Sequence, residues 1–187
     1  MNYTQLQTKI ASWLNRDDLA AVIPDFILLA EERINRHLRV RSMEVTLTPT
    51  AIVDNLVSLS STTLDVKTLW LDGYEDQPLK VQSLEAVLAM PTNALATHYA
   101  WQGTSLRLNG GGSVTGVLYQ KIPALATATN NWLSDSADSI YLFGSLIEAA
   151  VYSGSDPALW ESRFLTVVNE LQGNDQRYSG PLVARSR

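Results

Sequence analysis

Residues 139–171 read SIYLFGSLIEAAVYSGSDPALWESRFLTVVNEL and contain two apolar segments separated by a Gly, Ser, Asp and Pro turn. Between residues 140 and 152 the apolar side chains occupy most of the helix circumference, which predicts a helix covered on nearly every side. In a chain this short, we expect part of that cover to come from another subunit. Asp156 and Pro157 suit the start of a second helix, and Gly173 suits its end.

The first forty residues also have helical periodicity. Thr4 and Gln7 have the spacing of a capping box, and the apolar stripe that follows ends near Asn15. Pro24 fits the first turn of a second helix that continues to about Val40. We expect these two helices to pack together.

In residues 42–116 the sequence contains short segments in which apolar and polar residues alternate, a pattern typical of strands. Residues 72–78 (DGYEDQP) have the composition of a long hairpin turn, and the glycine-rich residues 109–113 have that of a flexible hairpin tip. The spacing predicts a meander of antiparallel strands with one face against the helices. Its last three strand candidates are residues 98–101, 105–108 and 114–120.

The expected fold class is therefore α+β, a helical bundle from the N- and C-terminal helices with a central antiparallel β-region. The expected boundaries are residues 1–41 and 117–173 for one helical domain, 42–116 for the inserted β-region and 174–187 for an extended C-terminal arm. The arm combines basic and apolar side chains without helical spacing, so we expect it to order only on a partner. Its candidate contact residues are Arg177, Tyr178, Leu182, Val183, Arg185 and Arg187.

The composition excludes several classes of site. The chain has 187 residues and no cysteine, which excludes disulfides and thiolate metal sites. The net charge of −5 argues against general affinity for nucleic acid, because such binding depends on Lys and Arg neutralising phosphates. There is no signal-peptide pattern and no apolar stretch of about 18 residues, so we expect a soluble protein with no membrane partner.

No constellation of residues predicts catalysis. The only histidines, His37 and His98, have no acidic or histidine neighbour at metal-ligand spacing. Residues 109–113 lack the Lys-Ser/Thr ending of a phosphate-binding loop. Adjacent acidic pairs such as Glu31 and Glu32 point in different directions and cannot converge as an acid and base pair. We expect a non-enzymatic protein without a cofactor or metal.

Four arginines close together in the second helix form the one charged feature that stands out. They are Arg33, Arg36, Arg39 and Arg41. One interpretation is a solvated helix end that complements the helix dipole, with Glu32 and Arg36 as an ion pair. A second is a patch that contacts another subunit or an acidic partner, and a third is weak contact with DNA.

Three segments in this order resemble the head-to-tail adaptor, or connector, proteins of tailed bacteriophages. They are residues 3–44 (YTQLQTKIASWLNRDDLAAVIPDFILLAEERINRHLRVRSME), 118–133 (LYQKIPALATATNNWL) and 141–164 (YLFGSLIEAAVYSGSDPALWESRF). Residues 57–66, VSLSSTTLDV, stand where this family usually has a Pro-containing phrase.

The resemblance implies a structural virion protein that forms a ring, commonly of twelve copies, in the neck between the portal protein and a tail or nozzle protein. DNA would pass through its lumen without sequence-specific binding, and the C-terminal arm would reach toward the portal. The protein would be in the host cytoplasm during assembly. The alternatives are a nucleic-acid-binding or packaging accessory protein that uses the patch from Arg33 to Arg41, and a tail-associated cell-wall hydrolase.

Overall fold

A computed structural model describes residues 1–179, and its helices and two β-sheets confirm the α+β class. The chain divides into two compact units. Met1–Ser42 and Ile122–Arg187 form the first, which we call the helical unit, and Met43–Lys121 form the second, the β-unit. Residues 117–121, which the sequence predicts in the helical domain, fall in the β-unit, and residues 117–120 are the end of its last strand.

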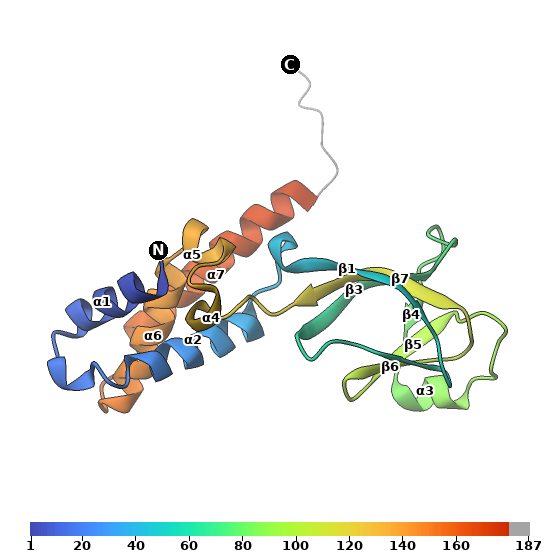
Figure 1. The fold of residues 1–187 in the computed structure, drawn as a ribbon, viewed down its shortest axis with the longest axis horizontal. Helices are drawn as coiled ribbons and strands as arrows, with labels where there is room; N and C mark the ends of the chain where they lie inside the picture. The colour runs from blue at the N-terminus through green and yellow to red at the C-terminus, as the bar shows by residue number, and fades with distance from the viewer. Residues whose placement is uncertain (180–187) are drawn as a thin grey trace, which may run out of the picture. The chain divides into compact units, whose positions relative to one another are not determined.

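The helical unit contains four longer helices and two short ones (Figure 1). They are α1 (Tyr3–Leu14), α2 (Ile23–His37), α4 (Leu125–Ala128), α5 (Trp132–Ser136), α6 (Ser139–Tyr152) and α7 (Ala158–Ser179). One 3₁₀ turn, Asp17–Leu19, lies between α1 and α2, and another, Arg41–Met43, leads into the β-unit. Helix α6 packs on α1, α2 and α7, so it is the centre of this unit.

The prediction that residues 140–152 form a widely covered helix is confirmed. Nine of the fourteen residues of α6 are buried, and three other helices of the same chain supply this cover. Gly144 allows α2 to come close, because a Cβ there would lie 2.9 Å from the Cβ of Ala30. The most exposed apolar side chains of α6 are in its last turn, Val151 and Tyr152.

The predicted capping box at Thr4 and Gln7 is wrong, because α1 begins earlier. Asn2 is the N-cap, and its side chain accepts a hydrogen bond from the backbone N–H of Gln5 while the Gln5 side chain bonds back to the N–H of Asn2. Thr4 therefore lies inside the helix. The predicted end is confirmed at Asn15, which has the left-handed conformation of a C-cap (φ 49°).

The predicted end of the last helix at Gly173 is also wrong, since α7 continues for six more residues. The neighbouring turns are tied to the end of α2 and to the 3₁₀ turn that follows it. The side chain of Gln172 donates to the carbonyl of His37 (2.8 Å), and Arg41 Nε donates to Asp175 Oδ1 (3.0 Å). These contacts offset the cost of a glycine inside a helix, which is about 1 kcal/mol relative to alanine.

Two polar side chains of α2 hold the chain where it returns from the β-unit. Asn35 Oδ1 accepts from the backbone N–H of Ile122 (3.0 Å), and Glu31 Oε1 accepts from that of Leu125 (2.7 Å). Burial raises the pKa of Glu31, while the hydrogen bond from Leu125 opposes this shift. These bonds satisfy backbone donors that would otherwise lack partners in the interior.

The β-unit contains seven strands in two sheets. One sheet has the order β1-β7-β3, all antiparallel, and the other has the order β2-β6-β5-β4, in which β4 runs parallel to β5. The elements are β1 (Glu44–Ala51), β2 (Leu56–Ser58), β3 (Thr63–Leu71), β4 (Lys80–Val81), α3 (Leu84–Ala89), β5 (His98–Gln102), β6 (Ser105–Leu108) and β7 (Ser113–Gln120).

The predicted meander is correct only for β5 and β6, which pair as a hairpin. Strand β7 instead crosses to the other sheet and lies between β1 and β3. Both sheets contribute to one hydrophobic core, so they cover each other. That one sheet face packs against the helices stays a prediction. The buried core residues are Val57, Leu69, Leu71, Leu79, Ala96, Tyr99, Leu106, Leu108, Val114 and Leu118.

Two predicted turns are connections between the sheets. Residues 72–78 join β3 in one sheet to β4 in the other, so they are not a hairpin turn. The two flanking segments share one backbone hydrogen bond, in which Leu79 N donates to Leu69 O (2.7 Å). The glycine-rich residues 109–113 are packed. A Cβ on Gly110 would lie 2.8 Å from the carbonyl oxygen of Asn93, so this position accepts only glycine without a shift of the backbone.

Candidate functional site

The described residues contain no cluster typical of a catalytic or metal site. Residues 1–179 hold no group of three or more His, Cys, Asp or Glu side chains that could bind a metal ion. His98 Nδ1 lies 2.9 Å from Thr97 Oγ1, and the ring of His37 packs edge-on against Phe164. Both histidines therefore have local structural contacts. Within the same residues, no helix combines the length and the hydropathy that crossing a bilayer requires.

The first predicted arginine, Arg33, contacts α6 of its own chain. Its Nη2 and Nε atoms lie 2.6 and 3.1 Å from Glu148 Oε1, and both side chains are mostly buried. A half-buried ion pair of this kind leaves an uncompensated charge when one partner is removed. Arg33 therefore links α2 to α6.

The other three predicted arginines differ from one another. Arg39 donates from Nη1 to two backbone carbonyls at the end of α2, both at 2.7 Å, and Arg41 pairs with Asp175 of α7. Arg36 is exposed, and the predicted ion pair with Glu32 is not among the ion pairs of the described residues. Of the predicted patch, Arg36 is the member most available to a partner.

An aromatic cluster on the helical unit is a second candidate surface. Trp160 stacks on Phe143 with ring centroids 6.3 Å apart, and Trp13 packs edge-on against both rings. The guanidinium of Arg163 lies 5.8 Å from the Phe143 ring centre and 5.7 Å from that of Trp160. Trp13 is 46% exposed. Tryptophan and arginine are enriched among the residues that dominate binding energy in protein interfaces.

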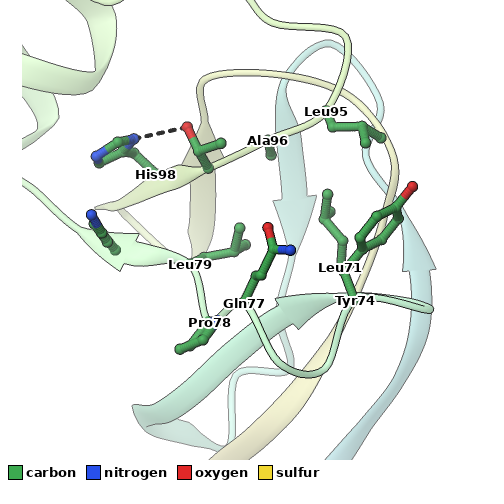
Figure 2. A pocket seen from close by; sticks show the side chains of 10 residues that line it. Leu71, Tyr74, Gln77, Pro78, Leu79, Leu95, Ala96 and His98 are labelled. Atoms are coloured by element: carbon green, nitrogen blue, oxygen red, sulfur yellow. Dashed lines mark hydrogen bonds between the residues drawn. The ribbon is translucent and has the colours of Figure 1, made fainter.

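The β-unit has a cavity of about 650 Å³ beside the connection between β3 and β4. Figure 2 shows Leu71 and Tyr74 on one side of it and Leu95 and Ala96 on the segment across from them. Leu71 and Ala96 belong to the buried core, whereas Tyr74 and Leu95 are 44% and 42% exposed. The cavity thus has an apolar floor and an accessible mouth.

Three carboxylates are close to Tyr74 in the sequence of the connection beside this cavity. Asp72, Glu75 and Asp76 are all exposed, and none of them forms an ion pair with a residue in the described part of the chain. Lys80 and His98 line the cavity. The three carboxylates are not among the residues that line the cavity, so Lys80 is the charged side chain of this lining.

Sequence reasoning missed this cavity because it interprets residues 72–78 as a solvated turn. The available signal was Tyr74, because a large aromatic side chain is not one of the residues that a solvated turn requires. The opposite wall, residues 95–98, comes from a different part of the chain, so local pattern cannot reveal the enclosure.

The predicted C-terminal arm is described only in its first part. Residues 174–179 are helical, and Arg177 and Tyr178 lie in the last turn of α7. Leu182, Val183, Arg185 and Arg187 lie outside the described residues. The prediction that they contact a partner stays a prediction.

Comparison with known proteins identifies the family. The family model for the SU10 adaptor protein matches residues 1–185, which is nearly the whole chain. No curated protein matches the sequence. Because the match covers nearly the whole sequence, the chain belongs to the SU10 adaptor protein family, a family of bacteriophage adaptors.

Proposed function

We propose that this protein is a head-to-tail adaptor that assembles as a ring of twelve copies between the portal and the tail of a phage particle. The observation that carries the proposal is the family match over residues 1–185. In this role the protein occupies the neck of the virion, contacts the portal on one side and a tail or nozzle protein on the other, and performs no catalysis.

The accessible surfaces support a ring. A closed ring uses heterologous contacts, so each copy must present two different surfaces that fit each other. The chain has an aromatic cluster around Trp13 on the helical unit and an apolar cavity beside Tyr74 on the β-unit. Aromatic residues are enriched in the buried centres of protein interfaces. Both surfaces suit contact with other proteins.

The net charge supports passage of DNA. Each copy carries −5, so a ring of twelve copies would carry about −60. A conduit with negative walls does not hold a polyanion. Three of the four arginines from residues 33 to 41 already have partners in the same chain, which argues against the alternative of a nucleic-acid-binding protein.

The mass of the purified assembly, alone and with the portal protein, tests the proposal. We expect a complex with twelve copies per portal ring, because a template supplies contacts that offset the loss of rotational and translational freedom. A stable dimer or tetramer that does not bind the portal would contradict it.

Arg36 offers a more local test. We propose that it contacts an acidic surface of a neighbouring copy or partner. Reversing its charge with Arg36→Glu should reduce incorporation into particles while helix content, measured by circular dichroism, stays the same. The matched variant Arg33→Glu should lower stability as well, because it breaks the pair with Glu148. Normal incorporation of the Arg36→Glu variant would assign this side chain to solvent.

A further inference from the structure

The outward face of α2 carries two neighbouring exposed leucines. Five exposed residues of this helix recur with the spacing of one helix face, and we call them the α2 stripe: Asp25, Leu28, Leu29, Glu32 and Arg36. Leu28 and Leu29, in the middle of the stripe, are 55% and 43% exposed. A single exposed leucine is ordinary on a protein surface, whereas exposed leucines side by side are typical of a contact surface.

Carboxylates flank the leucines of the stripe. Asp25 precedes them by about one helical turn, and Glu32 follows them by about one turn. In the described part of the chain neither carboxylate forms an ion pair, although Arg36 lies four residues after Glu32. A surface that matches the stripe therefore combines apolar side chains with a cation.

The aromatic cluster has this chemistry. Trp13 is 46% exposed, and Leu159, one turn before Arg163 on α7, is 56% exposed. The guanidinium of Arg163 lies over the rings of Phe143 and Trp160 and, among the described residues, has no ion-pair partner. A guanidinium that stacks on aromatic rings still presents the N–H groups at its edge to a carboxylate. The cluster therefore offers both apolar rings and a held cation.

The α2 stripe and the aromatic cluster lie on different sides of α6. Phe143 belongs to the cluster, whereas Glu148 faces α2 through its pair with Arg33. These two positions of α6 are about 140° apart around the helix axis, because each residue turns the helix by about 100°. The stripe points away from α6, since the buried residues of α2 occupy its other face. One copy therefore cannot place its own stripe on its own cluster.

We infer that the α2 stripe of one copy packs on the aromatic cluster of a second copy of this chain. The two leucines cover Trp13 and Trp160, and Glu32 pairs with Arg163. Glu32 is the partner because Asp25 lies in the first turn of α2, where the helix dipole already stabilises a carboxylate. A second copy is the occupant because this chain supplies both halves of the match in equal number.

The inference rests on the proposed function for the presence of neighbouring copies, and it names the surfaces through which they meet. Two different surfaces on different sides of one unit produce a head-to-tail contact, which is the kind of contact that closes a ring. Opposite charges at the edge of the apolar contact fix its register. The same contact repeats from copy to copy around the ring.

Disulfide trapping tests the contact, because the chain has no cysteine of its own. Full-length Leu159→Cys protein is mixed with Leu28→Cys or Leu29→Cys protein, with and without the portal protein, and oxidised. Covalent heterodimers are identified by mass. A disulfide requires the two Cα atoms to come within about 7 Å, so it reports close approach.

Leu88→Cys is the matched control for the two stripe variants, since Leu88 is a 58% exposed leucine of α3 in the β-unit. We expect at least one stripe variant to give about ten times more heterodimer with Leu159→Cys than the control gives. Yields from both stripe variants that do not exceed the control would overturn the inference.

An exchange of charges tests the ion pair. Glu32→Arg and Arg163→Glu each place like charges at the contact, and each alone should lower the yield of the assembly about tenfold. The chain that carries both substitutions again has opposite charges across the contact, so its yield should return to within about twofold of the parent. Helix content, measured by circular dichroism, should stay the same because both side chains are exposed.

Glu85→Arg is the control for the exchange, since Glu85 is an exposed glutamate of α3. Combined with Arg163→Glu, it should not restore assembly. Single variants that assemble normally, or a double variant at positions 32 and 163 that stays folded without recovering assembly, would contradict the inference.

The other occupants give different results. Trapping of the stripe cysteines only on the portal protein would place the stripe on the portal and overturn the inference. A complex of twelve copies that shows neither the trapped contact nor the charge exchange contradicts this inference alone. Trapped heterodimers in protein that does not bind the portal contradict only the proposed function.

Discussion

The two units of this protein are stabilised in different ways. The helical unit is built around one helix, α6, which three other helices of the same chain cover. The β-unit has no central element, because its core is shared by two sheets and the chain passes between them more than once. In the first unit, stability depends on side chains that contact α6. In the second, it depends also on the packed connections, residues 72–78 and 109–113.

The largest effect should follow from removing a buried side chain against α6. Phe164→Ala deletes a ring that is 2% exposed, and we expect it to lower the free energy of unfolding by about 3–5 kcal/mol. Leu165→Ala, which changes the adjacent, 45% exposed residue, should cost less than about 1 kcal/mol. Denaturant titration of both variants measures the difference. Similar losses for the two would mean that α6 is not the centre of the unit.

The corresponding change in the β-unit acts through a polar side chain of the packed connection. Asn109 Oδ1 accepts from the backbone N–H groups of Thr97 and His98, both at 2.9 Å. Asn109→Ala leaves these donors without that acceptor, which should cost about 1–3 kcal/mol. Asn93→Ala, an exposed position, is the control and should change stability by less than about 0.5 kcal/mol. A neutral Asn109→Ala would support the flexible hairpin tip that the sequence predicts.

A glycine-to-alanine pair tests where α7 ends. A Cβ on Gly173 meets no atom within 4 Å, so Gly173→Ala should stabilise the protein by about 0.5–1 kcal/mol. Gly154, after α6, has a φ of +70°, and Gly154→Ala should destabilise by a similar amount. Thermal unfolding measures both signs. If Gly173→Ala destabilises instead, the residue is a left-handed C-cap and the helix ends there.

The smallest effect concerns the pH dependence of the helical unit. Burial raises the pKa of Glu31 in the folded chain above its ordinary value of 4.5. Between the pKa of the unfolded chain and the higher pKa of the folded chain, the folded chain therefore binds more protons. The contribution of this group to stability is therefore lost as the pH rises through that window. Glu31→Gln keeps an oxygen acceptor for Leu125 without a charge.

We expect the Glu31→Gln variant to be slightly more stable than the parent protein at pH 7. Below about pH 4 the two should be equally stable, because the Glu31 carboxyl group of the parent is then mostly protonated in both the folded and the unfolded chain. Melting temperatures of the two proteins across this range measure the effect. Glu32→Gln, at the exposed neighbouring position, is the control. A difference that does not vary with pH would mean that Glu31 ionises normally.

The sequence predicts the helical unit better than the β-unit, and particular residues show why. Asn15 and Pro24 mark helix boundaries by local backbone preferences, and both predictions are confirmed. Gly173 fails as a boundary because side chains of the adjacent turns bind the end of α2 and the 3₁₀ turn after it, more than 130 residues away in the chain. A cap predicted from local sequence cannot include such a contact.

The cavity in the β-unit shows the same limit. Tyr74 is visible in the sequence, but the sequence predicts only a turn there, because the opposite wall of the cavity comes from residues 95–98. Similarly, the sequence predicts Arg33 as part of a charged patch. Its partner Glu148 lies on α6, and the order of residues along the chain does not show that α6 packs beside α2.

By itself the sequence determined the α+β class, the buried character of α6 and the absence of any cysteine chemistry, because each depends on composition or on the period of apolar residues along one segment. Only the tertiary structure decided which strands pair, that β7 joins β1 and β3, and that residues 109–113 are packed between strands. Strand pairing depends on backbone hydrogen bonds and side-chain contacts between segments far apart in the chain, and alternation within one strand carries no information about its partner.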